Sequence, residues 1–141
     1  MKFAVKERNS ETVRFVADIS CYENVPESEK LWMALDWAFK NNIDTTYLDL
    51  RGINMRIMTL DNKDLTGCDF RNSYWPGASM KNTILEWVDL TDSTFPIGGL
   101  LIATVKEAKL DNVIFVDDPY NPLPKPQKPK RTSNLLTISN K

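Results

Sequence analysis

The sequence contains no histidine among its 141 residues, and this absence restricts the chemistry open to it. Without histidine, Ser-His-Asp and Cys-His nucleophilic sites and histidine-ligated metals are excluded, and the commonest general base is missing. The sequence also lacks a glycine-rich phosphate loop and a carboxylate pair in a predicted cleft. We therefore expect a protein that is not an enzyme, with no catalytic residues, no bound metal and no cofactor.

Cysteines and long apolar runs are also scarce. Cys21 and Cys68 stand far apart in unrelated contexts, so neither a disulfide framework nor a zinc site is indicated. The first eight residues carry charges where a signal peptide needs an apolar stretch. The longest apolar run, residues 97–105, is nine residues long and too short to cross a bilayer. These features predict a cytoplasmic protein without a membrane partner.

The whole chain has no excess of charge of one sign, but single segments of it do. The chain has 18 basic and 19 acidic residues, a net charge of −1. Residues 46–118 have 7 basic and 11 acidic side chains, whereas residues 119–141 have 5 basic and none that is acidic. The near-neutral total therefore combines an acidic body with a basic tail. A uniformly charged nucleic-acid binder is not expected.

A five-residue period dominates the middle of the chain. Starting at Leu50, every fifth residue up to Phe115 is apolar, which by chance has odds of about five in a million. The residue two places before each of these is small or apolar, with Lys63 as the exception. A helix repeats at 3.6 residues and a strand at 2, so neither explains this period. A chain that turns a corner every five residues does.

Three of the five-residue units carry a recognisable pattern of small residue, Asp or Asn, Leu or Phe, and two polar residues. These units are residues 68–72, 88–92 and 108–112. They resemble the pentapeptide-repeat family, and the resemblance covers residues 46–117. It implies a mainly β fold, a right-handed quadrilateral β-helix with twenty residues per coil. Fourteen units would make about 3.5 coils.

Two places depart from the repeat pattern. Trp75 and Met80 are unusual at the central position, and Pro76-Gly77 follows Trp75 directly, so we expect a local distortion there. Lys63 occupies an inward position, where a buried, unpaired ammonium is not tolerated. We expect a second irregularity at this residue. Both departures are predicted to be bulges and not sites.

The N-terminal segment, residues 1–45, predicts a cap for the β-helix. Residues 2–8 and 12–19 are β-prone runs around a turn and predict a hairpin. Residues 26–42 predict a helix that is apolar over more than half its circumference and so must be covered on two sides. The hairpin and the first coil are the natural covers. A hairpin and helix before the repeats is also similar to the arrangement in many small phage and bacterial members of the family.

The C-terminal segment, residues 118–141, is rich in proline and lysine and cannot pack a core. We expect it to be a disordered tail. Two hypotheses are open for its apolar stretch, residues 135–138: it docks on the body of the protein, or it docks on a partner. The tail also has candidate contacts for nucleic-acid phosphates or an acidic protein groove, although five charges give only weak attraction. These contacts are Lys125, Lys128, Lys130 and Arg131.

Apolar residues at outward positions indicate an interface, because the faces of solenoids are usually polar. In the register of the repeat, seven such residues fall on outward or turn positions: Ile57, Ile84, Trp87, Ile97, Leu101, Ile102 and Ile114. The tentative interaction surface consists of Trp87, Ile97, Leu101 and Ile102. Whether these positions form one patch is left open.

Asp49, Asp69 and Asp89 recur at the same position of successive coils. They could form an acidic stripe for a basic partner or a metal. The alternative that we favour is that each carboxylate braces its turn by accepting hydrogen bonds from backbone N–H groups.

The sequence therefore predicts a non-enzymatic protein-binding module. From the N-terminal resemblance, we expect a phage or mobile-element accessory protein that inhibits or retargets a host factor, the host factor being its protein partner. The alternative is a DNA-mimic inhibitor of a DNA-handling enzyme such as a type II topoisomerase, a function found in some members of the family. Charge weighs against this alternative. Duplex DNA would carry about 10 negative charges over the length of the repeats. Residues 46–118, with 7 basic and 11 acidic side chains, have a net charge of only −4. Direct binding of nucleic acid is not expected, and the oligomeric state is open.

Overall fold

The computed structural model describes residues 1–55, 59–75, 79–98 and 102–117. The chain begins with an antiparallel hairpin of β1 (Lys2–Lys6) and β2 (Val13–Asp18), with a register shift between Val5 and Lys6. A helix, α1 (Glu27–Lys40), follows. The predicted hairpin and helix are thus present, with bounds a few residues shorter than expected.

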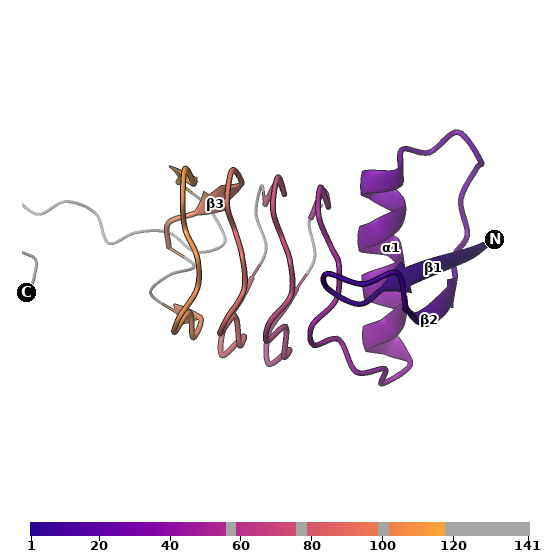
Figure 1. Cartoon of the computed structure of the whole chain (residues 1–141), viewed down its shortest axis with the longest axis horizontal. Coiled ribbons are helices and arrows are strands. Elements are labelled where there is room, and N and C mark those ends of the chain that lie inside the picture. Colours follow the sequence, from indigo (N-terminus) through magenta and orange to yellow (C-terminus); the bar gives the residue numbers. More distant parts are fainter. Residues whose placement is uncertain (56–58, 76–78, 99–101, 118–141) are drawn as a thin grey trace, which may run out of the picture.

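Helix α1 lies next to the first coil, across one end of the stacked coils, and the hairpin crosses it (Figure 1). Its small or aliphatic residues Ala34, Leu35 and Ala38 are fully buried. On the hairpin side, the rings of Phe15 and Trp37 stack with centroids 6.1 Å apart. This arrangement covers the two apolar sides of the helix, as its sequence requires.

The first coil is joined to both parts of the cap through its backbone. An antiparallel bridge joins Glu7 to Leu48, and the Asp49 N–H donates to the Lys6 carbonyl at 2.8 Å. The Asn54 N–H donates to the carbonyl of Ser28, in the first turn of α1, at 3.0 Å. The cap therefore occupies backbone groups that an open first coil would expose to other chains.

The repeats form a β-helix-like stack of coils. Parallel bridges join residues twenty apart, as in Asp49 with Asp69, Asn54 with Tyr74 and Asp69 with Asp89. The final pair of strands, β3 (Thr94–Pro96) and β4 (Ile114–Val116), is parallel and has the same spacing. Twenty residues are four of the five-residue units, so the pairing agrees with the period read from the sequence.

The core follows the five-residue period. All ten inward residues from Leu50 to Phe95 at intervals of five are fully buried. The Trp75 ring contacts two others, at centroid distances of 4.9 Å to Phe70, the preceding inward residue, and 5.0 Å to Phe95, twenty residues later in the same column. Its indole N–H donates to the Ser73 hydroxyl at 2.8 Å, which satisfies the one polar group of the ring. Trp75 and Met80 thus serve as core residues, while the expected distortion at Pro76-Gly77 lies outside the described residues.

Lys63 does not interrupt the coil, contrary to the sequence prediction. Its backbone makes the same bonds as other units, donating to Leu60 at 3.0 Å and accepting from Ile84 at 2.9 Å. Its side chain is half-buried, and the ammonium lies over the ring of Phe39 in α1, 5.1 Å from the centroid. A cation can face an aromatic ring favourably. The helix therefore provides the partner that allows lysine at an inward position next to the cap.

Among the residues that the structure describes, no helix combines the length and the apolar character that a bilayer crossing requires.

Candidate functional site

Most corners of the coils place one residue in the left-handed region of backbone conformation. In the described coils these residues have φ between 57° and 74° from Gly52 to Asp92. Glycine, asparagine and aspartate enter this region most readily, whereas a bulky residue there is an outlier. Corner residues should therefore be small or polar unless another requirement overrides the preference.

One corner departs from this rule, and we call it the aromatic corner. It consists of Tyr47, Gly67, Trp87 and Glu107, spaced twenty residues apart, with φ of 55°, 73°, 63° and 60°. Tyr47 and Trp87 are 51% and 56% exposed, so burial in the core does not explain them. The next corner along the chain, the polar corner, has Gly52, Asn72, Asp92 and Asn112 at the same backbone conformation.

Gly67 lies between the two aromatic residues and accommodates the first of them. A Cβ atom at this position would lie 2.2 Å from Cε1 of Tyr47. The tyrosine ring therefore rests directly on the glycine backbone, and no other residue type fits without moving it. At Gly52 of the polar corner, a Cβ atom would meet nothing within 4 Å. The aromatic corner is thus packed locally, although its rings remain half-exposed to solvent.

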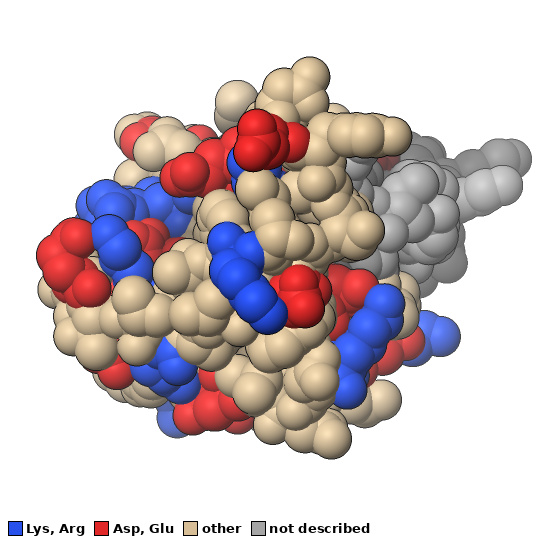
Figure 2. All heavy atoms as spheres, turned by 90° about the vertical axis from the view of Figure 1, so that its right-hand side faces the viewer, with Lys and Arg blue, Asp and Glu red and all other residues tan. Residues whose placement is uncertain are grey.

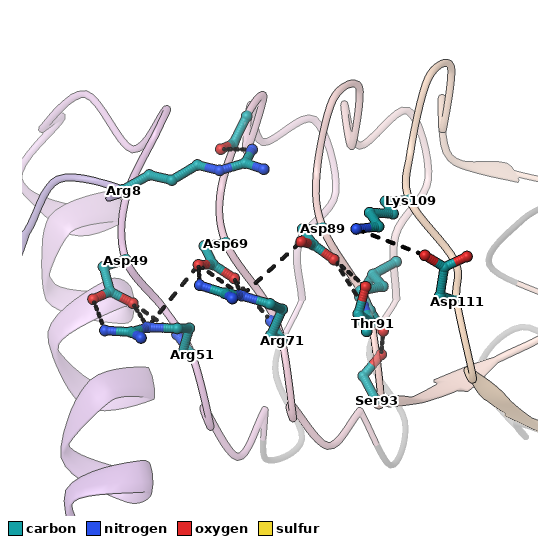
Figure 3. Close-up of polar contacts among 12 residues, drawn as sticks. Arg8, Asp49, Arg51, Asp69, Arg71, Asp89, Thr91, Ser93, Lys109 and Asp111 are labelled. Carbon is teal, nitrogen blue, oxygen red and sulfur yellow. Dashed lines mark hydrogen bonds and ion pairs between the residues drawn. The ribbon is translucent and has the colours of Figure 1, made fainter. Parts of the chain in front are cut away.

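Arg8 ties the hairpin to the aromatic corner. Its Nη1 donates to the carbonyls of Gly67 at 2.7 Å and Trp87 at 2.9 Å, across two successive coils. Its backbone N–H donates to the carbonyl of Tyr47 at 2.8 Å. Figure 3 shows this side chain extending from the hairpin along the stack. One arginine therefore fixes the backbone beneath the exposed aromatic rings.

A shallow groove of about 420 Å³ borders this corner and is lined by Glu7, Arg8, Asn9 and Tyr47. Its lining combines an aromatic ring, a carboxylate and an arginine. The aromatic corner and this groove together give an exposed apolar surface with polar groups at its edge. Such a combination is typical of surfaces that bind proteins.

The predicted interaction surface is distributed over several corners. Trp87 belongs to the aromatic corner. Ile102, which is 38% exposed, lies at a different corner, twenty residues after Asn82 and forty after Asn62. Ile97 is half-buried, its N–H bonded to the Val116 carbonyl at 2.9 Å. Trp87, Ile97 and Ile102 thus occupy three different corner positions of the coil.

The other predicted outward residues vary in exposure. Ile84 is half-buried, whereas Ile114 is 64% exposed. Ile57, Leu101 and the basic tail residues lie outside the described residues.

Tyr47 was not predicted, although its spacing could have revealed it. It is forty residues before Trp87, at the same corner, in the unit that precedes the first central residue of the repeat. Arg8 could not have been predicted, because it contacts residues 59 and 79 positions away through the docking of the hairpin.

The row of aspartates braces the turns of the polar corner, as the favoured interpretation predicted (Figure 3). The Oδ1 atoms of Asp69 and Asp89 accept from the backbone N–H of Arg71 and Thr91 at 3.1 and 3.0 Å. Arg71 also donates its side chain to Asp69, with Nη2 2.7 Å from Oδ2. Arg51 pairs with Asp49 in the same way. The carboxylates are therefore held by neighbours in the same unit.

Hydrogen bonding keeps two of these carboxylates charged. Burial pushes the pKa of Asp49 up, but hydrogen bonds from the side chain and backbone of Arg51 outweigh burial and hold the pKa below its ordinary value. Burial acts in the same direction on Asp89, where hydrogen bonds from the Thr91 hydroxyl and N–H prevail and lower the pKa. Both groups are therefore acceptors committed to the turn.

The two cysteines are the other groups with reactive side chains that the sequence analysis considered. Cys68 is fully buried, and burial raises the pKa of its thiol to about 12, so it is not a thiolate at neutral pH. Cys21 and Cys68 are both free. Within the described ranges, no three Asp, Glu or Cys side chains gather to hold a metal ion.

The comparison with known families identifies the repeat. The family model described as pentapeptide repeats matches residues 60–95, with 8 copies. Residues 60–95 therefore consist of pentapeptide repeats, and the β-helix-like stack of coils agrees with that family. No curated protein and no solved structure matches the chain.

Proposed function

We propose that this protein is a non-enzymatic protein-binding module that presents its aromatic corner to a protein partner. The scaffold is a right-handed quadrilateral β-helix of about 3.5 coils, with the hairpin and α1 as its cap. The proposal rests on Trp87, a bulky side chain that is 56% exposed at φ of 63°. Because this side chain is not buried, packing in the core does not offset the cost of its backbone conformation. Contact with a partner would be a reason to keep tryptophan there.

Three features of the site support protein binding. Tryptophan, tyrosine and arginine are the residues that contribute most often to the binding energy of protein interfaces. Tyr47, Trp87 and Arg8 bring all three types to one corner, over backbone that Arg8 holds through two carbonyls. A rigid support reduces the loss of entropy on binding.

We further propose that the partner is a host factor and that the protein is a phage or mobile-element accessory protein that inhibits or retargets it. The support is the hairpin and helix placed directly before the repeats, which is similar to small phage and bacterial members of the family. The free cysteines fit action in a reducing compartment, the cytoplasm.

DNA mimicry remains the second candidate, with weaker support. A DNA mimic needs a surface of negative charge, but Arg51 and Arg71 pair with the aspartate row and offset its charge. The face of the cap end shows acidic and basic side chains intermingled (Figure 2). A mimic should inhibit DNA supercoiling by a type II topoisomerase and lose potency steeply as salt rises. No inhibition at micromolar protein would eliminate this candidate.

Site-specific photo-crosslinking tests the proposal. A photo-reactive phenylalanine analogue is placed at position 87, and in a matched variant at position 72 of the polar corner, before exposure to host lysate. We expect one partner to be crosslinked from position 87 and not from position 72. The purified partner should then bind Trp87→Asn more than about 30-fold more weakly than the wild type, as for an interface hot spot. Equal crosslinking from both positions, or unchanged affinity, would refute the proposal.

A further inference from the structure

Among the described residues, nothing covers the C-terminal end of the solenoid as the hairpin and α1 cover the N-terminal end. Phe95 is fully buried, whereas Phe115, twenty residues later in the same column, is 39% exposed. Val105 and Leu110 are also only partly buried, while their counterparts Leu85 and Leu90 are fully buried. The last described coil therefore leaves core residues partly exposed to water.

The backbone at this end is open as well. In earlier coils, N–H groups at the central positions donate to the next coil, as Leu85 does to Thr104 at 2.7 Å and Leu90 to Lys109 at 2.8 Å. The N–H groups of Val105 and Leu110 have no acceptor in the part of the chain that the structure describes. An edge of this kind can pair with another chain unless something covers it.

The sequence of the residues that follow does not fit one more coil. The residue before each central position donates its N–H to the carbonyl twenty-one residues earlier, as in Thr104 to Thr83 and Lys109 to Val88, both at 2.9 Å. Continuing this register, the next donors would be Pro119, Pro124 and Pro129. Proline has no N–H to donate. The next inward positions would also include Lys125 and Lys130, which cannot be buried unpaired.

Prolines in register with the repeat would therefore deprive a further coil of its backbone donors, so the last described coil needs another kind of cover. Beyond them lies the one apolar stretch of the tail, residues 135–138 with sequence Leu-Leu-Thr-Ile. It is joined to β4, at the open end itself, by residues 117–134. A linker of this length, at about 3 Å per residue, reaches much further than the width of one coil. Attachment to the same chain also gives the stretch a high effective concentration at this end.

We propose that residues 135–138 cover the open end of the solenoid by packing on Leu110 and Phe115. Residues 118–131 serve as the tether, since their prolines prevent further pairing in register. The covered end would then differ from the capped end in one respect, because its cover is attached through a linker and can be displaced. This proposal concerns a different surface from the aromatic corner and does not depend on it.

Amide hydrogen exchange in the full-length protein tests this proposal. The probes are the N–H groups of Val105 and Leu110, measured by NMR in the wild type and in a triple variant, Leu135→Ser, Leu136→Ser and Ile138→Ser. We expect exchange at both amides to be at least about tenfold faster in the triple variant, because the edge loses its cover. Contacts between the Phe115 ring and the methyl groups of residues 135–138 should appear in the wild type alone.

A matched control, Leu123→Ser, removes an apolar residue of the tether and should leave both exchange rates unchanged. Equal rates in the wild type and the triple variant would overturn the proposal, whether the amides are protected or not. Protection that persists in the triple variant and rises with protein concentration would also overturn it. That result would assign the end to a second copy of the chain.

Discussion

The aromatic corner and the polar corner have the same left-handed backbone conformation at every coil but differ in their side chains. At the polar corner, Asn72 and Asp92 suit that conformation, and the carboxylates of the same units brace the turns. At the aromatic corner, Tyr47 and Trp87 adopt it at a cost, although no core position requires them. The β-helix therefore needs the turn but not the rings. Residues that the fold does not require, such as these two, are the best candidates for a functional role.

The difference between the corners also shows how the repeat tolerates exceptions. Tyr47 is accommodated because its neighbour in the column is glycine, and Lys63 because a helix of the cap offers the ring of Phe39. In each case a residue far away in sequence compensates for the departure. Four predictions test whether residues at the two corners contribute differently to the stability of the fold.

The largest effect should come from adding a single methyl group at each corner. Gly67→Ala should lower the free energy of unfolding by about 2 kcal/mol, because the new Cβ adds a clash with Tyr47 to the cost of its φ of 73°. Gly52→Ala at the polar corner should lose only about 1 kcal/mol, for the φ of 74° alone. Urea unfolding monitored by circular dichroism measures both. Equal losses would mean that the tyrosine ring is not held on the glycine.

The arginines of the two corners should differ as well. Arg8→Met should cost about 1–2 kcal/mol, since two carbonyls of successive coils lose a charged donor. Arg51→Met at the polar corner should cost less than about 1 kcal/mol, because the Arg51 side chain is 55% exposed and its ion pair with Asp49 is screened by solvent. The same unfolding experiment checks the pair. A larger loss for Arg51→Met would reverse the roles assigned to the two side chains.

Acid should weaken the polar corner in particular. The pKa values of Asp49 and Asp89 are lower in the folded state than in the unfolded chain, so their contribution is present above the unfolded pKa. It is lost as the pH falls through the lower, folded pKa values. The double variant Asp49→Asn and Asp89→Asn should therefore lose less stability than the wild type between about pH 5 and pH 2. Thermal unfolding across this range measures the slopes, and parallel curves would contradict the account of the turns.

The smallest effect on stability should come from Trp87→Asn. Asparagine adopts φ near 60° more readily than tryptophan, and the lost ring is half-exposed, so stability should be unchanged or rise by less than about 1 kcal/mol. Urea unfolding provides the check. A loss above about 2 kcal/mol would show that Trp87 stabilises the fold, and its exposure would then not indicate binding.

The fold could be predicted from the sequence to a large extent because its period is strict. Each central apolar residue marks an inward direction, and the resemblance to the repeat family implied twenty residues per coil, the spacing that the parallel bridges have. The expected bulge at Lys63 was wrong because the prediction assumed that no partner was available, and the ring of Phe39 depends on how the cap docks. Long-range packing of this kind leaves no local trace in the sequence.

The candidate site was predicted only in part. Trp87 was selected as an outward apolar residue, but so were Ile97 and Ile102, which occupy other corners. Backbone conformation separates them, since Trp87 combines exposure with a left-handed φ. The docking of Arg8 likewise depends on the arrangement of the hairpin against the coils. The period of the sequence predicts whether a side chain points inward or outward. It does not predict the free-energy cost of the backbone conformation at that position.

The affinity of the crosslinked partner for two corner variants tests the central claim most directly. Trp87→Asn changes the aromatic corner, and Asn72→Asp makes a conservative change at the polar corner that Asp92 of the same column already accommodates. Our account predicts that Trp87→Asn binds the purified partner more than about 30-fold more weakly at unchanged stability, while Asn72→Asp binds as the wild type does. Wild-type affinity in folded Trp87→Asn would contradict it.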